Sequence, residues 1–127
     1  MELVLIRGLP GSGKTTMARV LALVGYEHHE ADHYFERDGA YKFDPADLPK
    51  AHAWCLERAK NSIARGARCV VANTFTRRWE MQPYMDAAKA AGVPVRVIEA
   101  RGEWANCHGV PADAIERMRA RWEFVNA

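Results

Sequence analysis

The pattern of apolar and polar residues along the chain predicts short buried strands. Apolar runs rich in Leu, Val and Ile occupy residues 3–6, 69–72 and 95–98. A weaker run at residues 26–31 is interrupted by two histidines. Short continuous apolar runs are typical of parallel strands that are covered on both faces. We therefore expect these segments to form the sheet of the protein.

The segments between these runs repeat apolar residues at helical spacing. Helices are predicted over residues 16–23 and 50–64, from a cap at Thr76 to Gly92, and over residues 111–125. Glycines follow the first three of these segments, as is typical of helix ends. Strands that alternate with helices predict a parallel sheet with helices on both faces, which is a three-layer α/β/α fold.

The polar residues that follow the strands are the first place to look for chemistry. In parallel α/β sheets, ligands bind beyond the C-terminal ends of the strands. Here those ends are predicted at Gly8, Asp32, Asn73 and Ala100. The polar and turn-rich segment over residues 32–50 is expected to be irregular and to lie over this edge of the sheet.

Size and charge limit the possible classes of protein. The chain has 127 residues, so a single domain over residues 1–127 is expected. Its formal charge of +2 is too small for nonspecific duplex binding to be the main task. No apolar run approaches the roughly 20 residues that span a bilayer, and the first residues lack a basic secretion signal. We therefore expect a soluble, cytoplasmic protein.

The 3 cysteines of the chain contain no C-x-x-C pair, which argues against a disulfide framework or a zinc site.

Residues 8–16 match every fixed position of the phosphate-binding loop pattern G-x-x-x-x-G-K-[ST]. Glycines let the backbone N–H groups turn toward phosphate oxygens, Lys14 adds a positive charge, and Thr15 offers a hydroxyl ligand to Mg²⁺. The order of strand, loop and helix places an anion at a helix N-terminus. The residues predicted to bind ATP are Gly8, Pro10, Gly11, Ser12, Gly13, Lys14, Thr15 and Thr16.

The remaining motifs favour a compact phosphoryl-transfer fold. The chain has no Asn-Lys-x-Asp guanine-binding motif, and the run at residues 69–72 is not followed by the acidic residue of a motor ATPase. Phosphoryl transfer to an alcohol needs a base, for which Asp32 is the best candidate, and Lys14 would assist catalysis. The alternative for Asp32 is a helix cap before His33.

Further candidates lie after the second clear strand. Thr74 could position an acceptor phosphate and Asn73 could orient Mg²⁺-bound water, or both could belong to an ordinary turn. Arg77 and Arg78 could bind an acceptor phosphate, or form a solvated surface.

Two further groups of basic residues complete the candidates. One of Arg117, Arg119 and Arg121 could reach the donor phosphates, and the alternative is an exposed basic face. The histidines show no metal-ligand spacing with cysteines, so none is expected to be a ligand; they are His28, His29, His33, His52 and His108.

Several segments in this order resemble P-loop kinases related to the kinase domain of phage-type polynucleotide 5′-kinase. They are G-L-P-G-S-G-K-T-T at residues 8–16, D-H-Y at 32–34, F-D-P at 43–45, A-H-A-W at 51–54, N-T at 73–74, W-E-M at 79–81 and H-G-V-P at 108–111. The resemblance covers nearly the whole chain. It implies a kinase-type P-loop fold with a four-stranded parallel core.

The resemblance also implies an activity, which is transfer of the ATP γ-phosphoryl group to a 5′-hydroxyl of RNA or DNA. By the same resemblance, Lys14 and Thr15 hold the donor phosphates and Mg²⁺, Asp32 activates the acceptor hydroxyl, and Thr74 contacts the acceptor. The chain has Phe35 where the phage-type enzyme has an arginine, so Arg37 becomes the candidate for the acceptor phosphate.

Two other positions depart from the family. Ala72 stands where many relatives have an aspartate, and residues 102–110 contain no arginine where the family's lid usually brings one over the ATP phosphates. The leading interpretation is an ATP- and Mg²⁺-dependent polynucleotide 5′-kinase. A kinase acting on a nucleoside, sugar or antibiotic hydroxyl is the second hypothesis, and a nucleotide-binding regulator with little turnover is the third.

Overall fold

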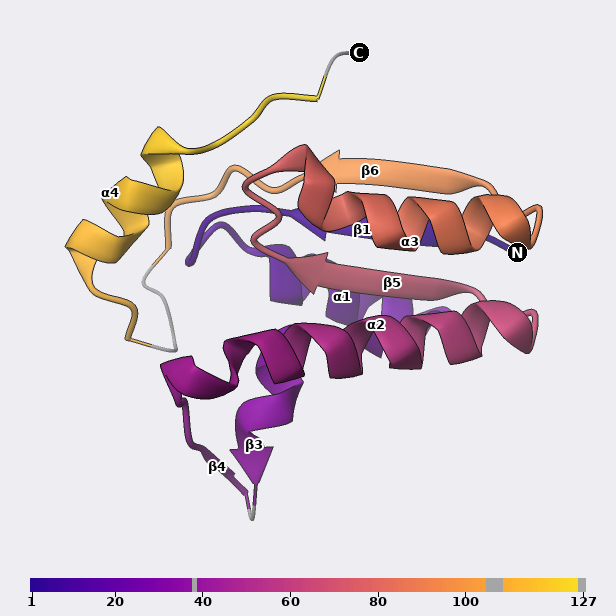
Figure 1. The fold of residues 1–127 in the computed structure, drawn as a ribbon, viewed down its shortest axis with the longest axis horizontal. Coiled ribbons are helices and arrows are strands. Elements are labelled where there is room, and N and C mark those ends of the chain that lie inside the picture. The colour runs from indigo at the N-terminus through magenta and orange to yellow at the C-terminus, as the bar shows by residue number, and fades with distance from the viewer. Residues whose placement is uncertain (38, 105–108, 126–127) are drawn as a thin grey trace.

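The structure is a computed structural model that describes residues 1–37, 39–104 and 109–125, with the side chain of Arg37 left out (Figure 1). Its central sheet has four parallel strands in the order β2-β5-β1-β6. The strands are β1 (Leu3–Arg7), β2 (Glu27–His29), β5 (Cys69–Asn73) and β6 (Val95–Glu99). This confirms the expected four-stranded parallel sheet, and the weak apolar run at residues 26–31 forms its short strand β2.

Helices cover both faces of the sheet, as the alternation of strands and helices predicts. Figure 1 shows α2 (Leu48–Ala64) and α3 (Arg78–Ala90) on one face, and α1 (Lys14–Leu23) behind the other. Side chains alternate along β1, so Leu3 and Leu5 join the core under α2 and α3, while Val4 and Ile6 join the core under α1. The fold is therefore the three-layer α/β/α arrangement.

The remaining elements gather where the parallel strands end. They are the 3₁₀ helix η1 (Ala31–Phe35), the hairpin strands β3 (Glu36–Arg37) and β4 (Ala40–Tyr41), the 3₁₀ helix η2 (Pro45–Asp47), and α4 (Ala112–Ala120). In Figure 1 the arrowheads of β5 and β6 point to the side of the molecule where α4 lies. Among the described residues, no helix combines the length and the apolar character needed to cross a membrane.

The C-terminal helix is shorter than the sequence pattern predicts. We expected a helix over residues 111–125, but α4 ends at Ala120. The Trp122 ring lies under the guanidinium of Arg7, 4.0 Å from its centroid to Cζ, and the Glu123 N–H donates to the Thr76 carbonyl at 2.7 Å. Because these contacts join residues 122 and 123 to the segments at the ends of β1 and β5, the chain does not continue as a helix beyond Ala120.

The cap of α3 also differs from the expected one. The N-cap is Arg77, whose backbone N–H donates to the Glu80 carboxylate at 3.3 Å, so Thr76 is not the cap. Thr76 is buried one residue earlier, and its hydroxyl contacts Glu80 and the Arg121 side chain. The hydroxyl of Thr76 thus links α3 to the C-terminal segment.

Candidate active site

The loop between β1 and α1 has the backbone geometry of an anion site. Gly13 is the N-cap of α1 and has a φ of 91°, in the left-handed region that favours glycine. A Cβ atom at Gly8 would lie 2.2 Å from Ser12 Oγ and 3.0 Å from the Ala100 carbonyl oxygen, so a larger residue there would force neighbouring atoms to shift. The loop leads directly into the N-terminus of α1 at Lys14, where the helix dipole and the backbone N–H groups attract negative charge.

The Ser12 hydroxyl supports a ligand at this loop. It is buried, and it has no hydrogen-bond partner among the described residues. A buried hydroxyl without a partner is costly, so such groups often mark a place where a ligand completes the hydrogen bonding. Together with the steric requirement at Gly8, this orphaned hydroxyl shows that the loop residues fit a phosphate group.

A distant segment braces the loop. The N–H of Gly102 donates to the Ser12 carbonyl at 3.0 Å, and the N–H of Trp104 donates to the Gly11 carbonyl at 2.8 Å. The Trp104 ring packs so closely on the loop that a Cβ at Gly13 would lie 2.8 Å from it. The chain that follows β6 is therefore hydrogen-bonded to the loop and packed against it.

A buried carboxylate faces the loop from β2. The Thr15 hydroxyl donates to Glu30 Oε1 at 3.0 Å, and Glu30 is only 3% exposed. Burial would raise the pKa of Glu30, but the bond from His28, the nearby histidine charges and the Thr15 hydroxyl together lower it. Glu30 is therefore ionised at neutral pH beside the hydroxyl expected to meet Mg²⁺.

Sequence reasoning missed Glu30. It lies directly after a weak strand, at the same edge of the sheet as Asn73. The pattern that could have found it is an acidic residue at the C-terminal end of a strand, but the sequence predicted the end of this strand at Asp32, whereas β2 ends at His29. The Glu30 carboxylate supplies negative charge at the C-terminal edge of the sheet, where Ala72 replaces the aspartate of many relatives.

Asp32 lies in the first turn of η1, half-buried, and its Oδ1 accepts a hydrogen bond from the Tyr41 hydroxyl at 3.2 Å. The alternative of a cap before His33 is wrong, because η1 begins at Ala31 and its N-cap is Glu30. The Thr15–Glu30 bond brings the segment that carries Asp32 up to the phosphate loop. The candidate base and the candidate loop thus lie at the same end of the sheet.

Asn73 and Thr74 join these parts. The buried Asn73 side chain accepts the Ala31 N–H at 2.9 Å and donates to Cys55 Sγ at 3.7 Å. The Thr74 carbonyl accepts the N–H of Gly8 at 3.3 Å. In this structure the Asn73 amide fixes the start of η1, and the Thr74 backbone fixes the start of the phosphate loop.

The arginine candidates on the acceptor side are spread out. Arg77 is exposed at the N-cap of α3, and its Nη1 lies 3.9 Å from Glu123 Oε2. Arg78 is exposed in the first turn of the same helix. The backbone of Arg37 lies in β3, but its side chain lies outside the described part of the chain, as do Cys107 and His108.

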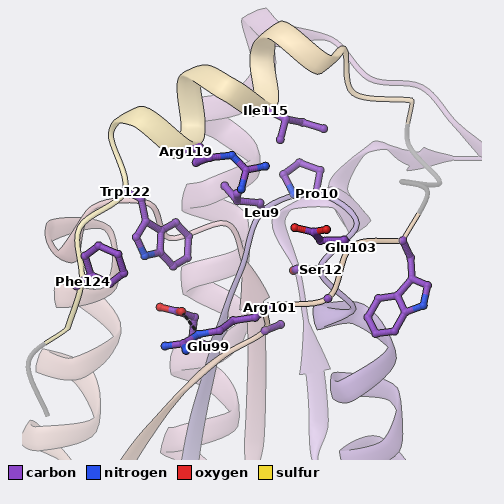
Figure 2. A pocket seen from close by; sticks show the side chains of 13 residues that line it. Leu9, Pro10, Ser12, Glu99, Arg101, Glu103, Ile115, Arg119, Trp122 and Phe124 are labelled. Atoms are coloured by element: carbon purple, nitrogen blue, oxygen red, sulfur yellow. Dashed lines mark hydrogen bonds and ion pairs between the residues drawn. The ribbon is translucent and has the colours of Figure 1, made fainter.

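A cavity of about 540 Å³ opens beside the phosphate loop, between the loop, the chain after β6, and α4 (Figure 2). Arg119 reaches from α4 toward Leu9 and Pro10 in this view. Arg119 also donates to Glu116 at 3.2 Å, just as Arg117 donates to Asp113 at 2.9 Å, and Arg121 donates to the Thr76 hydroxyl at 3.2 Å. Of the three C-terminal arginines considered from the sequence, Arg119 is the one that lines this cavity.

Comparison of the sequence with known proteins identifies a family and a relative. A family model described as an AAA domain matches residues 3–125. NEDD4-binding protein 2 of Homo sapiens is 34% identical over 139 aligned residues, which cover 97% of this chain. The chain spans only 8% of the length of that relative.

Two solved structures have a similar fold. The structure of the Pnkp1/Rnl/Hen1 RNA repair complex matches 94% of this chain and 43% of its own chain, with a TM-score of 0.69 and 15% identity. A gluconokinase from Sinorhizobium meliloti 1021 matches 97% of this chain and 75% of its own, with a TM-score of 0.66 and 14% identity. At these identities the likeness concerns the fold.

Proposed function

The chain belongs to this AAA domain family and has a kinase-type P-loop fold, and from that premise we propose that it transfers the γ-phosphoryl group of ATP to the 5′-hydroxyl end of an RNA or DNA strand. The observation that carries the proposal is the contact between Thr15 and Glu30. It joins the phosphate loop to the segment that carries Asp32, so a phosphate donor and a proton acceptor can meet at one edge of the sheet.

The donor nucleotide is held by the phosphate loop. The backbone of residues 8–16 surrounds the phosphates, and Lys14 neutralises charge that develops during transfer. Mg²⁺ held at the Thr15 hydroxyl would supply further positive charge to the phosphate oxygens. Glu30 orients that hydroxyl through its 3.0 Å hydrogen bond. Arg119 lines the neighbouring cavity and is the proposed substitute for the family's lid arginine.

Asp32 acts as the general base. It accepts the proton of the acceptor hydroxyl while that oxygen bonds to the γ-phosphorus. The bond from this phosphorus to the oxygen bridging the β- and γ-phosphates breaks, and ADP leaves. The Tyr41 hydroxyl holds Asp32 through its hydrogen bond, and Asn73 holds the turn that carries both Asp32 and Ala31.

A polynucleotide end is the acceptor that fits the exposed arginines best. Arg77 and Arg78 stand near the end of β5, where guanidinium groups can bind backbone phosphates of a strand. Thr74, and Arg37 on β3, would complete this side. A similar fold in an RNA repair complex supports the same choice.

The test is phosphoryl transfer from γ-labelled ATP with Mg²⁺ to matched acceptors. One arm offers a single-stranded oligonucleotide with a 5′-hydroxyl, as RNA and as DNA. A second arm offers the same oligonucleotides with a 5′-phosphate, which has no acceptor hydroxyl at that end. A third arm offers nucleosides and simple sugars. The Lys14→Ala variant measures background transfer.

Label on the 5′-hydroxyl oligonucleotide alone is the expected result. Label on a nucleoside or a sugar alone would replace this proposal by a small-molecule kinase, a possibility consistent with the gluconokinase fold. If no acceptor were labelled while ATP still bound, the proposal would be replaced by a nucleotide-binding regulator with little turnover.

A further inference from the structure

Three side chains with metal-binding atoms converge where β2 ends. His28, Glu30 and His33 each offer one ligand atom, and these atoms all lie within 4.8 Å of one another. The closest pair is His28 Nε2 and Glu30 Oε2, at 2.6 Å. The rings of His28 and His33 meet edge to face with their centroids 4.9 Å apart. The three groups therefore point at a common place.

The fold produces this convergence from local backbone geometry. Side chains alternate along a strand, so His28 and Glu30 share one side while His29 points to the other and bonds Ser62 at 2.7 Å. The chain then turns into η1, which returns His33 to the side of His28. The expectation that no histidine is a ligand rested on the spacing of histidines relative to cysteines, and this set of two histidines and a glutamate contains no cysteine.

The chemistry of the three groups suits an ion. Glu30 is 3% exposed and the His28 side chain 13% exposed, so both are largely removed from water. Two imidazole nitrogens with one carboxylate form a donor set that divalent transition metals accept, whereas Mg²⁺ prefers oxygen ligands.

We propose that His28, Glu30 and His33 bind a divalent first-row transition-metal ion of the zinc class, at a site separate from the Mg²⁺ position at Thr15. Glu30 faces His28 with Oε2 and Thr15 with Oε1, so it can hold the ion with one oxygen and keep the hydroxyl on the other. Bonds of about 2.0–2.2 Å bring ligand atoms to about 3.5 Å from each other. The three ligand atoms, which lie within 4.8 Å of one another, would have to adjust by side-chain rotation to reach this spacing.

Such an ion would stiffen the segment that carries Asp32. Two of its ligands, His28 and Glu30, precede that residue in the chain, and the third, His33, follows it directly. A bound ion would therefore join the end of β2 to η1 and stabilise the folded state, because the unfolded chain does not hold the three groups together. This inference concerns binding of the ion and does not depend on the proposed transfer reaction.

The experiment is a calorimetric titration of the chelator-treated protein with ZnCl₂ alone, in the absence of nucleotide. The variants are His28→Ala and His33→Ala, with His52→Ala as the matched control because His52 is exposed on α2. One zinc ion is expected to bind the wild type and His52→Ala equally. Since losing even an outer-shell partner costs roughly tenfold to a hundredfold in affinity, each ligand variant is expected to lose at least that much.

Two further measurements keep the proposal open to refutation. Circular dichroism establishes that each variant is folded, and His33→Gln replaces His33→Ala if the latter is not. Titration with Co²⁺ is expected to give a visible absorption band in the wild type and in His52→Ala, and none in the ligand variants. Equal affinity in all variants, or no binding to the wild type, would refute the site.

Discussion

The two sides of the candidate active site are built in opposite ways. The donor side is the phosphate loop over residues 8–16, a contiguous stretch whose shape follows from its own glycines. The acceptor side is Asp32 with the side chains that hold it. Asn73 reaches from β5 to the backbone N–H of the preceding residue, Ala31, and Tyr41 reaches Asp32 from the hairpin. The residues of the donor side are therefore contiguous in the sequence, although Thr74, Gly102 and Trp104 brace them, whereas the acceptor side is assembled from distant segments.

This difference predicts different consequences of damage. A change in the loop alters the binding of the nucleotide itself, because the phosphates touch that backbone. A change around Asp32 leaves the loop intact and alters the position of the base, so turnover falls while nucleotide affinity stays. Measuring affinity and turnover separately distinguishes the two sides.

The largest expected effect on the acceptor side comes from Asp32→Asn. The amide keeps the size of the side chain but cannot accept the proton, so turnover is expected to fall by about 10²–10⁴-fold. Affinity for a fluorescent ATP analogue is expected to stay at the wild-type value. Single-turnover transfer and equilibrium titration measure the two quantities.

Asp86→Asn is the matched control for this substitution. Asp86 is exposed on α3, where it accepts a hydrogen bond from Gln82 at 2.8 Å, and the variant is expected to keep wild-type turnover. Full turnover in Asp32→Asn would remove the base from the mechanism. An equal loss of affinity and turnover would mean that Asp32 belongs to the donor side.

The same division explains how much the sequence could predict. The phosphate loop and the three clear strands follow from local patterns, namely spaced glycines and continuous apolar runs. The acceptor side does not, because the contact of Asn73 with Ala31 joins residues far apart in the chain. Glu30 was missed for this reason: its importance comes from the Thr15 hydroxyl, which only the packing of α1 beside β2 brings near.

The C-terminal segment shows the same limit. Apolar spacing predicts a helix to residue 125, yet the chain leaves the helix after Ala120. One competing contact is that of Trp122 with Arg7, which is 1% exposed and also donates to the Phe75 carbonyl at 3.0 and 2.7 Å, and the other is the bond from the Glu123 N–H to the Thr76 carbonyl. A buried arginine at the end of an apolar strand has no local pattern, so the end of the helix could not be predicted.

On the donor side, Gly8→Ala is expected to have an intermediate effect. The added methyl group would meet Ser12 Oγ at 2.2 Å, and overpacking of this kind costs about 1–3 kcal/mol in the free energy of unfolding. Nucleotide affinity is expected to fall as well, because relief of the clash moves the loop. Urea denaturation and titration with the ATP analogue measure the two losses.

Gly92→Ala controls for the general cost of replacing a glycine. It has a φ of 70°, and a Cβ there meets nothing within 4 Å, so only a backbone cost of about 1–2 kcal/mol is expected. That variant is expected to lose stability but keep its nucleotide affinity. If Gly8→Ala bound nucleotide as well as Gly92→Ala does, the loop would not be rigid at its first position.

The smallest effect is expected from Tyr41→Phe, which removes only the hydroxyl that bonds Asp32 at 3.2 Å. A net hydrogen bond contributes about 0.5–1.5 kcal/mol, so loss of this orienting bond is expected to lower turnover by roughly twofold to tenfold. Tyr26→Phe is the matched control, because the hydroxyl of the half-buried Tyr26 also donates to a carboxylate, that of Glu2, at 3.1 Å. Tyr26 and Glu2 lie just before the first residues of β2 and β1, at the end of the sheet opposite to Asp32. Both variants are expected to lose similar stability by thermal unfolding. Only Tyr41→Phe is expected to lose turnover, and equal turnover in the two variants would show that Asp32 needs no support from the hairpin.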